Sequence, residues 1–187
     1  MRWIDELKHD TTTRPYLSPS TAAYYDNWAE YLSWRNSRIV SFMQYPLQDP
    51  GPHASSYNGF ASGLLTYTGR QKPAYDAFRL PLFLPVTSTR RGRSLEVWGD
   101  VRPSDYAKLD TGVSQVALIQ FQANSRGAFK TVKKVSVGGQ GYFDVHYTFP
   151  SSGTVRLAWT YPTVDSAFPA NAARATVHSR YVKITIR

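Results

Sequence analysis

The pattern of apolar and polar residues predicts one α/β unit in the first half of the chain. Residues 20–36 carry apolar side chains at helical spacing, and Ser20 can accept hydrogen bonds from the first free backbone amides. The stripe that would face a core consists of Ala23, Trp28, Tyr31 and Leu32. Residues 38–47 follow as a nearly continuous apolar and β-branched run, which is typical of a parallel strand covered on both faces. A helix followed directly by a buried strand indicates α/β architecture.

Shorter elements surround this unit. Residues 2–7 form a short strand-like run, and residues 48–60 form a loop that is long for a mere connection. Residues 64–72 predict a small hairpin or turn around Gly69. Pro73 can take the first helical position of a helix that continues to Arg79.

From Thr87 onward the pattern changes to short strands separated by turns. The predicted strands are 95–101, 113–121, 129–137, 142–149, 155–161 and 181–186. Turn sequences lie at 124–127, 138–141 and 150–153, and no helix is predicted between the strands. This spacing favours an antiparallel sandwich.

The alternation within these strands also predicts which side chains form the core. In the run 113–121, Ala117, Ile119 and Phe121 share one face and are the better core set. Trp159, on a late strand, is expected to anchor the core.

Composition narrows the chemistry. The chain has 187 residues and Cys 0, which excludes disulfides and thiolate catalysis. The longest apolar stretch, residues 80–86, falls far short of the roughly 20 residues of a membrane-spanning helix. The first residues lack the features of a secretory signal, so either the chain stays inside the cell or its true start is missing.

The net charge of +9 is concentrated in the second half of the chain. Residues 1–85 hold 8 Lys/Arg against 7 Asp/Glu, whereas residues 86–187 hold 14 against 6. Basic clusters occur at Arg90, Arg91 and Arg93 and at Lys130, Lys133 and Lys134. We interpret them as solubilising side chains, with contact to an anionic cell-wall polymer such as teichoic acid or an acidic polysaccharide as the alternative. No nucleic-acid motif accompanies them, so nucleic acid is not an expected partner.

Several motifs together resemble a known family. They are residues 3–6, 31–36, 41–45 and 63–65 and, most specifically, the run Lys-Pro-Ala-Tyr-Asp-Ala-Phe at 72–78. This set resembles the C-terminal part of bacterial (β/α)8-barrel glycoside hydrolases of the retaining, cellulase-like clan. Residues 97–103, 141–145 and 179–184 resemble the sandwich domains appended to such barrels.

The resemblance implies a fold and a domain organisation. It implies a partial TIM-barrel remnant, consisting of the last barrel units, followed by an antiparallel immunoglobulin-like β-sandwich. The corresponding domains are 1–85, a linker at 86–93, and 94–187. The intact parent is expected to be extracellular, although this chain carries no signal peptide.

The resemblance also implies site residues. Glu6 aligns with the nucleophilic glutamate, although Leu7 and the residues after it depart from the family pattern, and a solvated surface acid is the alternative. Gln44 and Tyr45 lie at the predicted strand end, where barrel enzymes contact substrate, and a packing role is the alternative for Tyr45. The four His residues are scattered, so no metal and no cofactor is expected.

The predicted function is therefore that of a C-terminal fragment of a glycoside hydrolase. A closed barrel needs eight strands and about 250 residues, so the fragment is expected to be inactive alone. One alternative is a non-catalytic carbohydrate-binding or cell-wall-binding sandwich that uses exposed aromatic residues such as Trp98, Tyr142 and Tyr147. Another is a module completed by an upstream chain that carries the missing barrel strands.

Overall fold

The computed structural model describes residues 17–50, 62–124, 126–162 and 175–187. The chain divides into two compact units, Met1–Phe78 and Arg79–Arg187. The division lies before the boundary drawn at residue 85 from the sequence. The reason is that Leu80, Leu82 and Leu84 are buried in the hydrophobic core of the second unit.

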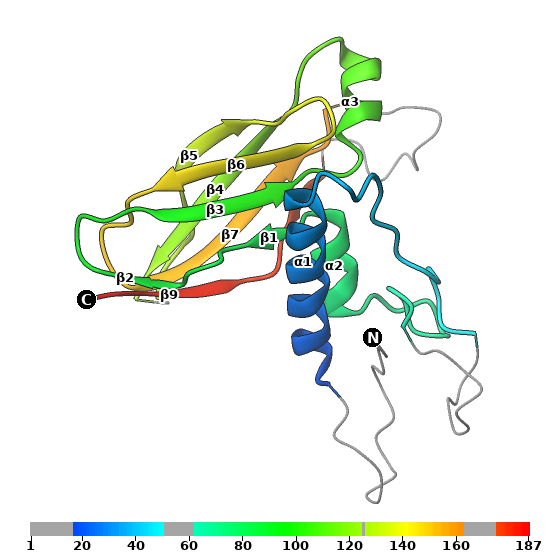
Figure 1. Cartoon of the computed structure of the whole chain (residues 1–187), viewed down its shortest axis with the longest axis horizontal. Helices are drawn as coiled ribbons and strands as arrows, with labels where there is room; N and C mark the ends of the chain where they lie inside the picture. The colour runs from blue at the N-terminus through cyan, green and yellow to red at the C-terminus, as the bar shows by residue number, and fades with distance from the viewer. Residues whose placement is uncertain (1–16, 51–61, 125, 163–174) are drawn as a thin grey trace, which may run out of the picture. The chain divides into compact units, whose positions relative to one another are not determined.

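The helices of the first unit form as the sequence predicts. Helix α1 (Pro19–Arg35) begins slightly earlier than expected, because Ser18 rather than Ser20 is the cap: its hydroxyl accepts from the Thr21 amide at 3.2 Å. Helix α2 (Pro73–Arg79) begins with its proline. The two helices lie side by side (Figure 1), where the buried Asn27 side chain of α1 donates a 2.7 Å hydrogen bond to the carbonyl of Ala77.

The strand predicted at 38–47 does not form. This segment belongs to no sheet, and most of its apolar side chains are exposed, by 96% for Val40 and 83% for Met43. Its backbone makes single hydrogen bonds rather than a ladder: the Ile39 amide donates to the carbonyl of Asn36, and the carbonyl of Leu47 accepts from the Leu65 amide. An apolar run becomes a parallel strand only beside partner strands, and the described residues supply none. The other predicted strand, 2–7, lies outside the described residues.

A buried ion pair organises the turn that precedes α2. The ammonium of Lys72 lies 2.8 Å from one carboxylate oxygen of Asp49, and the Gly63 amide donates to the other at 2.9 Å. Between them, Leu65 forms an antiparallel bridge with Gln71, and Gly69 adopts φ 80°. The predicted turn around Gly69 is thus confirmed, since its positive φ favours glycine.

The second unit consists mainly of two sheets that share one core (Figure 1). The smaller sheet has the order β1-β3-β6 and contains β1 (Leu82–Phe83), β3 (Leu95–Asp100) and β6 (Tyr142–Tyr147). The larger sheet has six strands in the order β2-β9-β7-β4-β5, with β8 also paired to β7. Its strands are β2 (Ser88–Thr89), β4 (Val116–Ala123), β5 (Lys130–Ser136), β7 (Gly153–Thr160), β8 (Thr176–His178) and β9 (Val182–Ile186). All pairs in both sheets are antiparallel except β2 with β9.

The core follows the predicted alternation. Ala117, Ile119 and Phe121 point inward and are at most 5% exposed, and Trp159 is 2% exposed, so these predictions are confirmed. Trp98 was expected to be exposed, which is wrong: it is fully buried, with Tyr142 stacked on it at 5.8 Å between ring centroids. Because β3 is covered on both faces, its aromatic residue is a core residue rather than a surface contact.

Four short elements escaped the sequence analysis. They are β1, β2, β8 and the helix α3 (Ser104–Thr111), which ends at Gly112 with φ 70°. The helix is short and mostly polar, so it has no apolar stripe that would predict it. The three strands have two or three residues each and are defined by their partners rather than by any local pattern.

The predicted fold class, a TIM-barrel remnant followed by an immunoglobulin-like sandwich, is therefore wrong for this chain. The described residues are mainly β-sheet, with three helices, and contain no barrel units. The individual antiparallel strands predicted after residue 94 are confirmed. The apolar run at 38–47 has the composition of a buried strand but no partner strands among the described residues.

Candidate functional site

The candidate site is the outer face of the six-stranded sheet, which we call the basic face. Leu118, Gln120 and Gln122 alternate with the inward residues of β4 and therefore point outward. Directly opposite them across the sheet lie Lys134 on β5 and Arg156 on β7. One strand further, Lys183 on β9 lies opposite Thr154, which itself lies opposite Gln122. Lys134, Arg156 and Lys183 therefore share one face of the sheet.

The two sheets differ completely in the sign of their charges. The six strands of the larger sheet contain five Lys/Arg residues and no Asp or Glu; the five are Lys130, Lys133, Lys134, Arg156 and Lys183. The three strands of the smaller sheet contain three acidic residues, Glu96, Asp100 and Asp144, and no Lys or Arg. Such segregation gives the basic face a net positive field that no carboxylate within its strands offsets.

A stack of three side chains lies on the basic face. Phe129, from the loop before β5, stacks on Tyr181 with ring centroids 5.6 Å apart and an interplanar angle of 16°. The Arg156 guanidinium lies 4.1 Å from the Phe129 ring centroid and donates through Nε to the Gln120 amide oxygen at 2.7 Å. Tyr181 is 60% exposed. We call Arg156, Phe129 and Tyr181 the aromatic stack.

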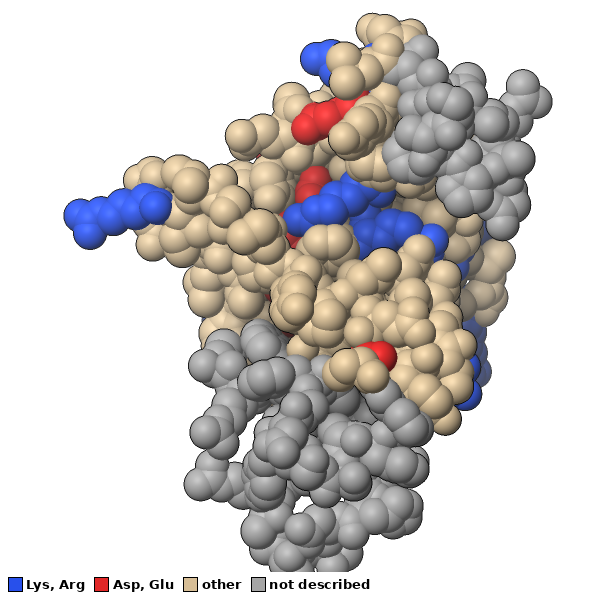
Figure 2. Space-filling view, turned by 90° about the vertical axis from the view of Figure 1, so that its right-hand side faces the viewer, with Lys and Arg blue, Asp and Glu red and all other residues tan. Residues whose placement is uncertain are grey.

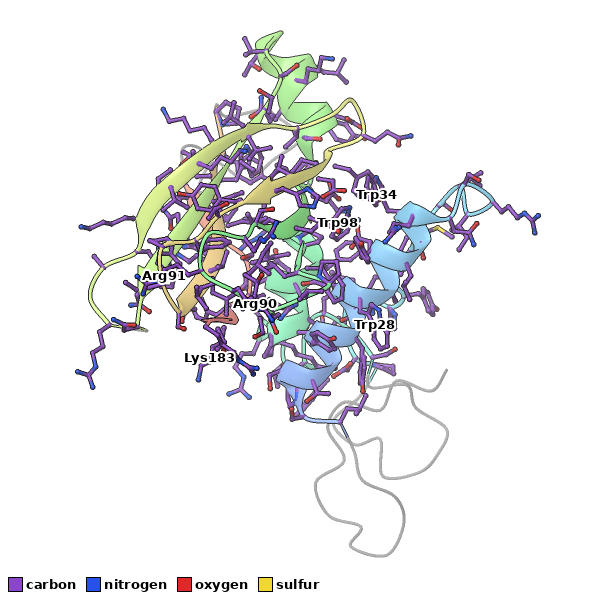
Figure 3. The ribbon with its side chains drawn as sticks, turned by 60° about the vertical axis from the view of Figure 1, so that its left-hand side comes forward. Trp28, Trp34, Arg90, Arg91, Trp98 and Lys183 are labelled. Atoms are coloured by element: carbon purple, nitrogen blue, oxygen red, sulfur yellow. The ribbon has the colours of Figure 1, made fainter. Side chains whose placement is uncertain are left out.

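More positive charge lies where β2 joins the sheet. The Arg187 amide donates to Thr89 and the Arg91 amide donates to Arg187, which holds residues 89–91 beside the end of β9. Figure 3 shows Arg90, Arg91 and Lys183 at this end of the sheet. Arg90 and Arg91, in the segment predicted from the sequence to be a linker, thus add positive charge at this end of the basic face. Figure 2 shows a side that carries both blue and red atoms, so not every surface of the chain is purely basic.

The smaller sheet ends in an unusual carboxyl group. Asp100 is 1% exposed, and one of its oxygens forms an ion pair with Arg102 at 3.1 Å. The other oxygen is buried and makes no hydrogen bond within the described part of the chain. Burial raises the pKa of the Asp100 carboxyl from 3.8 to about 6, although the Arg102 guanidinium acts to lower it.

The residues predicted as a site from the sequence do not lie on the basic face. Glu6 falls outside the described residues. Gln44 and Tyr45 are neighbours in the extended segment 38–47, where the Gln44 amide donates to the carbonyl of Ser62 and Tyr45 is 88% exposed. Their roles stay predictions. The residues of the aromatic stack and Lys183 were missed, although the absence of Asp and Glu from the late strands could have been read from the sequence.

The chain offers no gathered metal ligands within its described ranges. No three His, Cys, Asp or Glu side chains come together there in a way that could hold a metal ion. None of the described helices is long and apolar enough to cross a membrane.

No family model and no curated protein matches the chain. Among solved structures, a superoxide reductase (neelaredoxin) from Ignicoccus hospitalis aligns with 9% identity and a TM-score of 0.40, covering 58% of this chain and 80% of that one. A protein of Thermotoga maritima assigned as a superoxide reductase aligns with 10% identity and a TM-score of 0.38, covering 57% of this chain and 83% of that one.

The glycoside hydrolase family and function predicted from the sequence are therefore corrected. The described residues form two antiparallel-rich sheets and contain no barrel to which a retaining glycosidase site could belong. The described residues contain no barrel units that a partner chain could complete. At this similarity the superoxide reductases lend no activity to the chain, and we carry none over.

Proposed function

We propose that this protein is a binding module whose basic face holds a linear anionic polymer, that is, one that repeats carboxylate or phosphate groups along its length. The observation that carries this proposal is the segregation of charge between the two sheets. Five Lys/Arg residues and no Asp or Glu occupy the larger sheet, which is otherwise built from uncharged residues. A face of one sign attracts polymers of the opposite sign along its whole length.

The shape of the face suits an extended ligand. Lys134, Arg156 and Lys183 belong to β5, β7 and β9, so positive charge recurs across the sheet rather than at one point. Neighbouring strands lie about 4.8 Å apart, which spreads these charges over a distance that a polymer of several units can follow. A single small anion would meet only one of them.

Magnitudes favour a polymer over a monomer. One exposed ion pair in water contributes about 1 kcal/mol at 4 Å, which by itself is too weak for stable binding. Several such pairs on one polymer add together and release condensed counterions, so the affinity should fall steeply with salt. The anionic polymers named as the alternative in the sequence analysis, teichoic acid and acidic polysaccharides, belong to this class of partner.

The experiment uses fluorescently labelled polyglutamate titrated with the protein at low salt and at physiological ionic strength. We expect saturable binding that weakens with salt. Lys183→Glu should lower the affinity about tenfold, because it reverses one charge of the basic face. Lys108→Glu is the matched control: it reverses an exposed lysine on α3, outside both sheets, and should change the affinity less than about twofold.

Equal losses from the two variants would show that only the net charge of the protein matters, and the proposal would then be wrong. Absence of binding even at low salt would overturn it as well. Lys134→Glu provides a second position on the same face and should behave like Lys183→Glu.

A further inference from the structure

We infer that the anionic polymer bound by the basic face is built from sugar rings, and that Tyr181 is the side chain on which the apolar C–H face of one sugar stacks. This inference rests on the proposed function and narrows it to an acidic polysaccharide. It is carried by the aromatic stack, which lies among the cations of the same face. A face that bound charge alone would need no exposed aromatic ring.

The geometry leaves one side of the Tyr181 ring available. One face of the ring lies on Phe129 in a nearly parallel stack, and the side chain as a whole is 60% exposed. The open face is therefore the one turned away from Phe129. Phe129 in turn has the Arg156 guanidinium over it, so the ring beneath the ligand is held in place. Preorganisation of this kind lowers the entropic cost of binding.

The cationic side chains of Arg156 and Lys183 lie close to the Tyr181 ring in the sheet. Tyr181 directly precedes Val182, which pairs with Val155, so the register of β7 and β9 brings Tyr181 beside Arg156. Arg156 uses only Nε in a hydrogen bond within the described residues, which leaves its terminal nitrogens for a carboxylate. Lys183 is two residues after Tyr181 and therefore points to the same face of the sheet.

The surrounding side chains suit hydroxyl groups. Gln120 lies between Arg156 and Thr131: its amide oxygen accepts from Arg156 Nε at 2.7 Å, and its amide nitrogen lies 3.5 Å from the Thr131 hydroxyl oxygen. The second amide hydrogen of Gln120 and the Thr131 hydroxyl can still form hydrogen bonds with sugar hydroxyls. Among the described residues of this face, one aromatic stack is present, whereas single-stranded nucleic acid is bound on successive aromatic platforms, one for each base. These two observations favour a uronic-acid polymer over a nucleic acid.

The test compares three labelled polyanions: polygalacturonate, which has rings and carboxylates; polyglutamate, which has carboxylates without rings; and a single-stranded oligothymidylate. Tyr181→Ala should lower the affinity for polygalacturonate about fivefold or more, the size of a lost stacking contact, and leave that for polyglutamate within about twofold. Tyr181→Phe keeps the ring and should restore binding. Tyr106→Ala is the matched control, since Tyr106 on α3 is 57% exposed.

Each result is decisive. If polyglutamate and polygalacturonate both fail to bind, the proposed function itself is overturned. If both bind and Tyr181→Ala weakens them equally, the basic face stands and the sugar-stacking inference is wrong. If the oligothymidylate binds more tightly than polygalacturonate and depends more strongly on Tyr181, the ligand is nucleic acid and the inference is also wrong. Should Tyr181→Ala fail to fold, Tyr181→Leu covers Phe129 without a flat ring and should give the same selective loss.

Discussion

The two sheets of the second unit share one core but present opposite chemistry outward. The larger sheet carries lysine and arginine, a polar surface and an exposed tyrosine. The smaller sheet carries Glu96 and Asp144, buries its tryptophan and ends in a buried carboxyl group. Both faces satisfy the same packing requirement, so the core does not dictate the difference. Charged side chains on the outer faces can contact a ligand, whereas the buried Asp100 carboxyl group affects the stability of the fold.

The largest expected effect concerns the end of the smaller sheet. A Cβ at Gly141 would lie 2.3 Å from an Asp100 oxygen, 2.7 Å from the Ser104 hydroxyl and 2.8 Å from the Val101 carbonyl, at φ +91°. Gly141→Ala should therefore destabilise the protein by about 2 to 5 kcal/mol, through backbone strain and overpacking. Urea unfolding measures the change. Gly139→Ala, with no atom within 4 Å of its Cβ, is the control and should stay within about 0.5 kcal/mol.

The next prediction concerns how the stability of the fold depends on pH through the buried Asp100 carboxyl group. Because the folded-state pKa of Asp100 is raised to about 6, its contribution to stability is fully present below about 3.8 and is lost as the pH rises through 6. The difference corresponds to about 3 kcal/mol. Asp100→Asn, beside Arg102 and Asp105, should remove this loss.

The measurement is the free energy of unfolding of both proteins at pH 4 and pH 7. Relative to the native protein, Asp100→Asn should become more stable by about 2 to 3 kcal/mol as the pH rises between these values. Asp144→Asn is the control, because that carboxyl group is exposed on the neighbouring strand β6. Parallel profiles for native protein and Asp100→Asn would show that the carboxyl group titrates normally.

The smallest expected effect compares the two outer faces directly. Lys183→Gln and Asp144→Asn each remove one charge, one from each sheet. Lys183→Gln should weaken polyglutamate binding about three- to fivefold. Asp144→Asn should strengthen it less than about twofold at physiological salt, because packed sheets lie about 10 Å apart and the Debye length is about 8 Å. If the two substitutions changed the affinity by equal factors, the polymer would not bind preferentially to the basic face.

Local sequence was sufficient for elements whose signals are local. The helix at α1 and the strands of the second unit have clear periodicity, and Ala117, Ile119 and Phe121 were identified as core from alternation alone. The segment 38–47 shows the limit of this reasoning. Its apolar residues suit a buried strand, yet without partner strands the segment stays outside any sheet, with Val40 and Met43 exposed. The family expectation rested on short motifs, most specifically residues 72–78, which form helix α2 here without any barrel units among the described residues.

The candidate site could be anticipated only in part. The excess of lysine and arginine after residue 85 is visible in the sequence, and so are the clusters at 90–93 and 130–134. Nothing in the linear order shows that Arg156, Phe129 and Tyr181 meet, since four strands, β5 to β8, lie in the chain between the loop before β5 and the start of β9. Trp98 was predicted to be exposed but is buried, because β3 is covered on both faces and that covering depends on tertiary packing.

The sequence by itself determined the helix, the main strands, their inward faces and the total charge, because these depend on periodicity and composition. Only the tertiary structure decided which strands share a sheet. That pairing sorted the basic strands from the acidic ones, placed Tyr181 beside Arg156 and buried Asp100. Hydrogen bonds between distant strands set these neighbourhoods, and no local pattern encodes the choice of partner.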